Sequence, residues 1–177
     1  TDPGETPIQL VVLDGTAAAD LLDTNTPASV VAVHASPDAP AVDILADGSV
    51  VIDSLVFKEA SPFITVEEGS IDVEVEALLP GDATATVIGP ATLDIAGDER
   101  VTVIAVGDTA NIEPLVLTAP EVTLGAGETR LRVVHAAPDA PAVDVYATEP
   151  GADLAIESPL GTAAFGEDLG PLTVPAG

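Results

Sequence analysis

Residues 71–77 read Ile-Asp-Val-Glu-Val-Glu-Ala, an alternation of aliphatic and acidic side chains with a period of two. Successive side chains of a β-strand point to opposite faces of its sheet. This stretch would therefore bury isoleucine and valine on one face and hold three carboxylates in water on the other. It predicts a strand of an all-β protein.

Short apolar runs separated by Gly, Pro and Asp flank this stretch on both sides. They are residues 29–35, 41–46, 50–53, 62–67, 70–77, 83–88, 91–95, 100–107 and 112–118. Asp47-Gly48 and Gly97-Asp98 stand where tight turns between strands are expected. This cadence predicts an immunoglobulin-like antiparallel β-sandwich. Its core would hold small and β-branched side chains, because the chain has three Phe, one Tyr and no Trp or Met.

An eleven-residue phrase occurs twice in the chain. Residues 33–43 read VHASPDAPAVD and residues 134–144 read VHAAPDAPAVD, with ten of eleven positions identical at a shift of 101 residues. Further on, Phe57 corresponds to Phe165 at a shift of 108, which implies a seven-residue insertion near residues 149–152. Such a repeat predicts tandem modules.

The repeat divides the chain into four expected segments. They are residues 1–28, a linker with an exchangeable strand at 8–13 and a helical turn at 17–22; residues 29–118, a first sandwich; residues 119–130, a linker; and residues 131–177, the first half of a second module.

The second module lacks the counterpart of residues 70–118. Half a sandwich leaves an apolar face and open strand edges unsatisfied. Three arrangements would account for it: a chain that has been cut, pairing with residues 8–29 of the same chain, or pairing with the N-terminal strand of a neighbouring molecule.

The charge is strongly acidic, with 30 Asp and Glu against Lys58, Arg100, Arg130 and Arg132, for a net charge of -26. Nucleic acids and anionic membrane surfaces need basic residues, so both are excluded as partners. A saline environment is expected, because salt screens the repulsion between carboxylates.

No Cys is present, so disulfides and thiolate metal sites are excluded. There is no apolar run near 20 residues for membrane insertion, and the absence of an initial Met and a signal peptide suggests a processed chain.

The phrase His-Ala-x-Pro-Asp-Ala-Pro-Ala-Val-Asp, following a valine-rich strand, resembles the DUF4397 family. The family has no assigned function and occurs, often in tandem, in exported and surface proteins of bacteria and archaea. The resemblance covers roughly residues 29–118 once and residues 131–177 in part. It implies an extracellular or cell-surface β-sandwich and brings no catalytic residues.

The repeated phrase also supplies the candidate site residues. They are His34, Pro37, Asp38, Pro40, Asp43, His135, Pro138, Asp139, Pro141 and Asp144. The histidines could serve as pH switches or metal ligands, with the four aspartates as weak metal candidates. The favoured interpretation is structural: each His hydrogen-bonds the backbone of the Pro-Asp-Ala-Pro turn, and Asp38 makes an Asx turn.

Catalytic and calcium-binding patterns are weak. Ser36 lies near His34 but becomes Ala137 in the repeat, so a chemistry shared by both copies cannot use it. The Asp-x-Asp-x-Asp-Gly calcium loop is absent and the acidic residues are dispersed, although calcium remains a candidate ligand.

We therefore expect a non-catalytic, cofactor-free structural or adhesive module outside the cell. Its partners would be itself or other surface proteins, through added strands that build oligomers or fibres. The alternative is a binding module for calcium or surface glycans.

Overall fold

The computed structural model describes residues 10–13, 18–21, 27–120 and 122–176. Within these ranges the regular structure consists of strands and one 3-10 turn, which confirms the all-β prediction. The strands before residue 121 are β1 (Leu10–Leu13), β2 (Ala18–Leu21), β3 (Ala28–His34), β4 (Val42–Ala46), β5 (Ser49–Leu55), β6 (Ile64–Val66), β7 (Gly69–Leu79), β8 (Ala83–Ile95), β9 (Glu99–Val106) and β10 (Glu113–Pro120). After it come β11 (Glu128–Val134), β12 (Val143–Val145), β13 (Gly161–Ala163) and β14 (Asp168–Pro175), and the turn η1 is Thr109–Asn111. No helix in the described ranges is long and apolar enough to cross a membrane.

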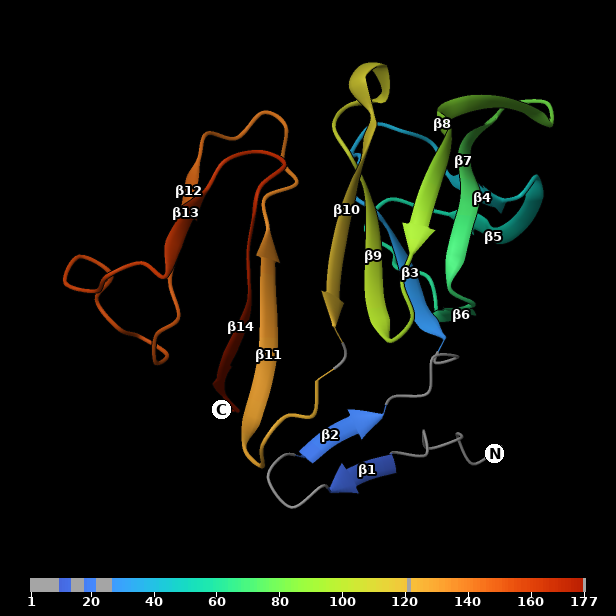
Figure 1. Ribbon diagram of the computed structural model, residues 1–177. Helices are drawn as coiled ribbons and strands as arrows, with labels where there is room; N and C mark the ends of the chain where they lie inside the picture. Colours follow the sequence, from blue (N-terminus) through green and yellow to red (C-terminus); the bar gives the residue numbers. More distant parts are fainter. Residues whose placement is uncertain (1–9, 14–17, 22–26, 121, 177) are drawn as a thin grey trace.

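Two four-stranded sheets make up the N-terminal module, defined here as residues 28–120. One sheet has the order β10-β9-β3-β6 and the other β5-β4-β7-β8 (Figure 1). Their facing sides share a core in which Ala32 and Ala105 of the first sheet meet Val42, Val75 and Ile88 of the second. The core therefore lies between two layers, as the period-two pattern requires.

One strand pair departs from the expected antiparallel arrangement. β3 and β9 run parallel, in register from Ser29↔Arg100 to His34↔Ala105. Parallel neighbours cannot be joined by a tight turn and need a long crossover, which here passes through the opposite sheet along β4, β5, β7 and β8. The prediction of a purely antiparallel sandwich is wrong at this pair.

Residues 83–88 and 91–95, expected as two strands, form the single strand β8. Its partner β7 is eleven residues long and pairs with β8 from Gly69↔Ile95 to Leu79↔Ala83. Register shifts opposite the Gly89-Pro90 dipeptide accommodate the break. A Cβ on Gly89 would stand 2.5 Å from the Val73 carbonyl oxygen, so glycine is required there.

The N-terminal hairpin corrects a second expectation. A helical turn was expected at residues 17–22. Residues 18–21 instead form strand β2, which pairs antiparallel with β1. The neighbouring apolar strand offers backbone partners that the local Ala-rich sequence does not reveal. The predicted strand at 8–13 is confirmed over Leu10–Leu13, and residues 8, 9, 17 and 22 lie outside the described residues.

The Asp47-Gly48 turn was predicted correctly. Both residues have positive φ, 47° and 75°, as the two-residue connection between β4 and β5 requires.

Residues 128–175, called here the C-terminal repeat, pair in the same way as the start of the N-terminal module. The equivalent Cα partners are Ala28↔Val66 with Thr129↔Val174, and Val42↔Leu55 with Val143↔Ala163. These pairs follow the shifts of 101 and 108 residues, and the seven extra residues lie between Val145 and Gly161. Repeated sequence therefore has repeated local structure.

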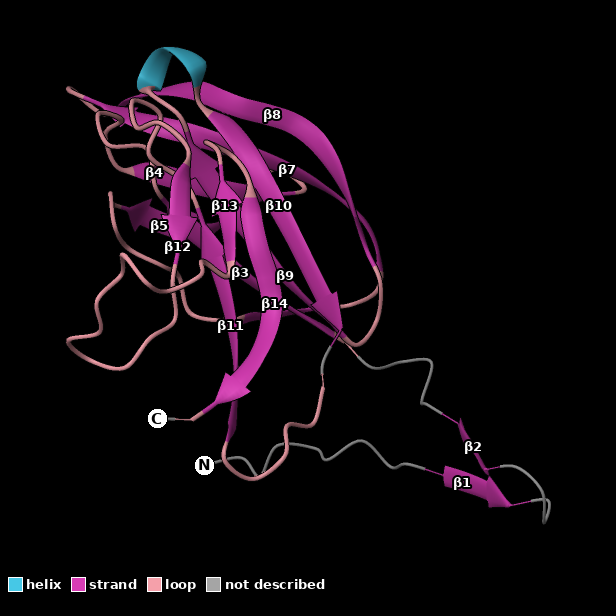
Figure 2. Ribbon diagram, turned by 90° about the vertical axis from the view of Figure 1, so that its left-hand side faces the viewer, coloured by secondary structure: helices cyan, strands magenta, loops and turns pink. Residues whose placement is uncertain are grey.

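The repeat covers the outer face of the first sheet. Ile104, Val106 and Leu117 form a buried cluster there, against which Val134 and Phe165 of the repeat pack. Figure 2 shows β11 and β14 in front of β9 and β10. Within the described ranges β1 and β2 pair only with each other, so pairing of the repeat with residues 8–29, one of the three arrangements considered for the repeat, is not observed there.

Candidate functional site

His34 closes the turn that follows β3. Its Nε2 lies 3.0 Å from the carbonyl oxygen of Pro40, and its Nδ1 accepts a hydrogen bond from the Ser36 N–H at 3.3 Å. Because Nδ1 is the acceptor, the ring proton is on Nε2, which donates to Pro40. The side chain is fully buried, and its ring meets Phe57 edge-on with centroids 6.3 Å apart.

His135 makes the same two bonds in the repeat. Its Nε2 lies 3.0 Å from the Pro141 carbonyl oxygen, and its Nδ1 accepts from the Ala137 N–H at 3.4 Å. The backbone N–H of His135 donates to the Glu167 carbonyl at 3.0 Å, as that of His34 donates to Glu59.

Both ring nitrogens of each His are thus engaged by the backbone. The predicted turn-closing role agrees with these bonds, and it leaves neither nitrogen with a lone pair for a metal. Pro40 and Pro141 hold the acceptor carbonyls, while Pro37 and Pro138 line a groove of about 600 Å³ between the two turns.

Asp38 and Asp139 occupy equivalent positions but differ in their contacts. The Asp38 carboxylate accepts a hydrogen bond from the Thr109 N–H at 2.9 Å, which fastens the turn to η1. The predicted Asx turn is wrong, because it needs the backbone N–H two residues after Asp38, and Pro40 has none. The long-range bond to Thr109 takes its place. Among the described residues of the repeat there is no counterpart of η1, and Asp139 has no such bond.

Asp43 and Asp144 hold their hairpins together. The Asp43 carboxylate accepts from the Ser54 N–H at 2.7 Å, and the Asp144 carboxylate accepts from the Thr162 hydroxyl at 2.5 Å. Asp43 therefore joins β4 to β5, and Asp144 joins β12 to β13.

The four aspartates are not assembled with other acids into a cation cage. In the part of the chain that the structure describes, no three His, Asp or Glu side chains come close enough to hold a metal ion together. Three of the four carboxylates bind protein donors instead.

Ser36 is completely buried, and its hydroxyl has no hydrogen-bond partner. A buried hydroxyl is closed to substrate, and the repeat has alanine at this position.

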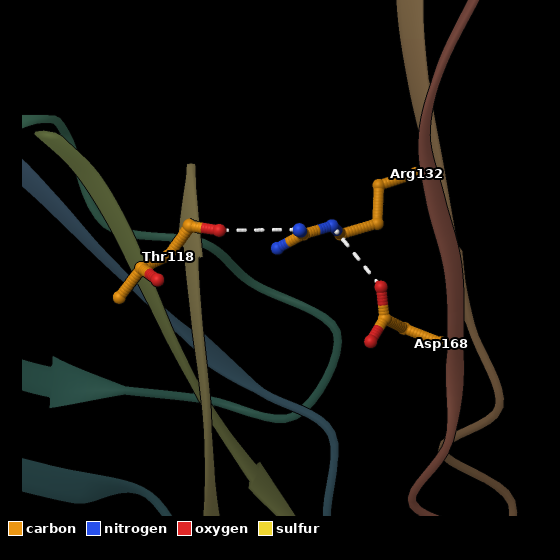
Figure 3. Close-up of polar contacts among 3 residues, drawn as sticks. All are labelled: Thr118, Arg132 and Asp168. Atoms are coloured by element: carbon orange, nitrogen blue, oxygen red, sulfur yellow. Dashed lines mark hydrogen bonds and ion pairs between the residues drawn. The ribbon is translucent and has the colours of Figure 1, made fainter. Parts of the chain in front are cut away.

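Sequence reasoning missed two arginines that join the repeat to the N-terminal module. Arg132 of β11 donates from Nη2 to the Thr118 carbonyl of β10 at 3.2 Å, and its Nε lies 3.1 Å from the Asp168 carboxylate (Figure 3). Arg130 donates to the Pro120 carbonyl at 2.8 Å. Both acceptors lie on β10, the edge strand of the first sheet, so arginine donors take the place of a neighbouring strand.

A signal for this contact was present in the repeat. At a shift of 101 residues, Arg130 and Arg132 stand where the N-terminal module has Ser29 and Val31. The chain has only four basic residues and a net charge of -26. Two of these four stand at positions where the two copies of the repeat differ. Together with Arg100 they line a cavity of about 370 Å³ between the repeat and the first sheet.

Comparison with known proteins identifies the family. The model of the domain of unknown function DUF4397 matches residues 28–146, more than half of the chain, including both copies of the His-Pro-Asp phrase. No curated protein and no solved structure matches the chain. The paired His-Pro-Asp turns thus lie within the matched span, and the chain belongs to the DUF4397 family.

Proposed function

We propose that this chain is a non-catalytic structural module of the cell surface or extracellular space, which joins copies of itself end to end by adding strands. In this proposal the N-terminal module is an immunoglobulin-like sandwich, and the C-terminal repeat is the first half of a second DUF4397 module. The acidic composition supports a saline exterior, where salt screens the repulsion between copies.

The observation that carries the proposal is a difference between equivalent valines. Val42 of β4 is 1% exposed, whereas Val143 of β12 is 39% exposed. They occupy the same place in the repeated phrase and in its hairpin. Val42 packs against Ala32 and Ala105 of the facing sheet, and its strand β4 pairs with β7 as well as with β5. Val143 belongs to neither buried cluster, and β12 pairs only with β13 among the described strands.

β4 is a template for what would complete β12. β7 pairs with it antiparallel and places Ala77 opposite Val42 and Val75 opposite Ile44. A strand added to β12 would therefore place small or β-branched side chains opposite Val143 and Val145, and would satisfy the free backbone edge.

The occupant we assign is β5 of a second copy. β5 is an edge strand of its sheet, and Val50 and Val51 on it are 54% and 46% exposed. Exposed β-branched residues on a strand edge favour pairing with another chain. The donor edge is in the N-terminal module and the acceptor edge is in the repeat. The contact is therefore heterologous and extends into a filament if it does not close into a ring.

The test uses one blocked edge per variant. Val143→Lys blocks the acceptor edge and Val50→Lys blocks the donor edge, while Ile156→Lys changes an 81% exposed loop residue as the matched control. Lysine reduces the net charge of -26, so added repulsion cannot explain a loss of assembly. Mass is measured by light scattering against protein concentration in about 1 M NaCl, where the screening length is about 3 Å.

We expect concentration-dependent assembly of the wild type and of Ile156→Lys, and monomers for each edge variant. Mixing the two edge variants should give a dimer and nothing larger, because only one complementary pair of edges remains. A wild type that stays monomeric at all concentrations, or edge variants that assemble like the control, would refute the proposal. Circular dichroism establishes that every variant is folded.

A further inference from the structure

A second feature lies inside the N-terminal module, away from the proposed assembly edges. A cavity of about 250 Å³ separates the two sheets, with Val30 and Val103 on one side and Ile52, Ile71 and Leu93 on the other. Thr65 is the single polar residue among the sixteen that line it. The walls are therefore almost entirely hydrocarbon.

The composition of the chain explains why this space is open. The chain has three Phe and one Tyr, and no aromatic side chain lines the cavity. Ala32 and Ala46 contribute only a methyl group each. Aliphatic side chains on two sheets about 10 Å apart leave a gap that a ring would otherwise fill.

Water is a poor occupant of this cavity. A buried water molecule needs two to four polar partners, and the only polar side chain of the lining, that of the exposed Thr65, has a single hydroxyl. Apolar cavities of about 150 Å³ stay dry and accept benzene, so a space of about 250 Å³ has room for a slightly larger hydrocarbon.

Charge limits the class of guest. Thr65 is the only polar residue of the lining, and no Lys, Arg or His is among the sixteen residues. A carboxylate end group on a guest would therefore lose its water without gaining a charged partner, in a chain whose net charge is -26.

We infer that this cavity binds a small uncharged apolar molecule, such as a short alkyl chain or a hydrocarbon ring, and that it discriminates against fatty-acid anions. The inference rests on the N-terminal module alone and does not depend on assembly through β5 and β12.

The probes are toluene, 1-octanol and octanoate. Their binding is monitored by NMR of the methyl groups of the isoleucine, leucine and valine residues. Ile64→Phe fills the cavity from β6, and Ala46→Leu fills it from β4 in case the first variant does not fold. Val116→Phe, on a 40% exposed residue of β10 that does not line the cavity, is the matched control.

We expect toluene and octanol to shift the methyl signals of the lining residues saturably in the wild type and in Val116→Phe. Octanoate should require at least about tenfold higher concentration, because burying its charge among hydrocarbon side chains is costly. The filled variants should lose the shifts and keep their folded spectra. No saturable shift up to the solubility limit, equal binding of octanol and octanoate, or unchanged binding in a folded filled variant would each overturn the inference.

Discussion

Replacing each of the two equivalent valines by alanine measures how differently the two copies of the repeated phrase are packed. Val42→Ala removes two methyl groups from a side chain that is 1% exposed and packs in the inter-sheet core. At about 0.8 kcal/mol per buried carbon the transfer contribution is about 1.6 kcal/mol, and the cavity left behind raises the loss to roughly 2–3 kcal/mol. Val143→Ala makes the same chemical change at a side chain that is 39% exposed, where the neighbours can relax and the loss should stay below about 1 kcal/mol.

Urea unfolding followed by far-ultraviolet circular dichroism gives both free energies, because the chain lacks Trp and has one Tyr as an optical probe. The measurement is made at low protein concentration, where the proposed assembly does not bury Val143. Equal losses for the two variants would refute the reasoning, since they would mean that Val143 is packed as well as Val42. A loss for Val143→Ala that grows with protein concentration would instead support assembly through β12.

Two further variants test contacts of the paired turns and of the arginines. Ser36→Ala, which installs the residue found in the repeat, should raise the free energy of unfolding by about 1 kcal/mol because it removes a buried hydroxyl without a partner; a destabilised variant in urea unfolding would contradict this. Arg132→Gln should lower the free energy of unfolding by about 1 kcal/mol, because it breaks the ion pair with Asp168, whose side chain is 26% exposed, and weakens the contact with β10. Hydrogen exchange of the β11 amides should become faster in Arg132→Gln, and unchanged exchange would show that the arginine does not hold the repeat in place.

Much of the local structure could be predicted from the sequence. The period-two pattern of residues 71–77 identified β7, and Asp47-Gly48 identified a hairpin turn. The repeated phrase predicted that His34 and His135 bind the backbone of their turns, because both partners lie within six residues of each ring. These features depend on residues that are close together in the chain, so a short stretch of sequence is enough to predict each of them.

Other contacts join residues that are far apart in the chain. Asp38 binds the N–H of Thr109, 71 residues away, and β3 pairs in parallel with β9. Neither contact has a local signal, because the crossover that brings the partners together depends on how the two sheets pack. The helical turn expected at residues 17–22 was wrong over Ala18–Leu21 for a related reason: β1 supplies backbone partners to that segment.

The sequence alone determined the all-β class, the duplicated turns and the acidic surface, because alternation, repetition and charge are properties of the chain itself. The tertiary structure decided which copies of the same residue are buried, where the arginines of β11 find their acceptors, and that a hydrocarbon-lined space separates the sheets. Burial and cavities depend on the second layer that covers a strand. Val42 and Val143 share a sequence context but not that covering layer.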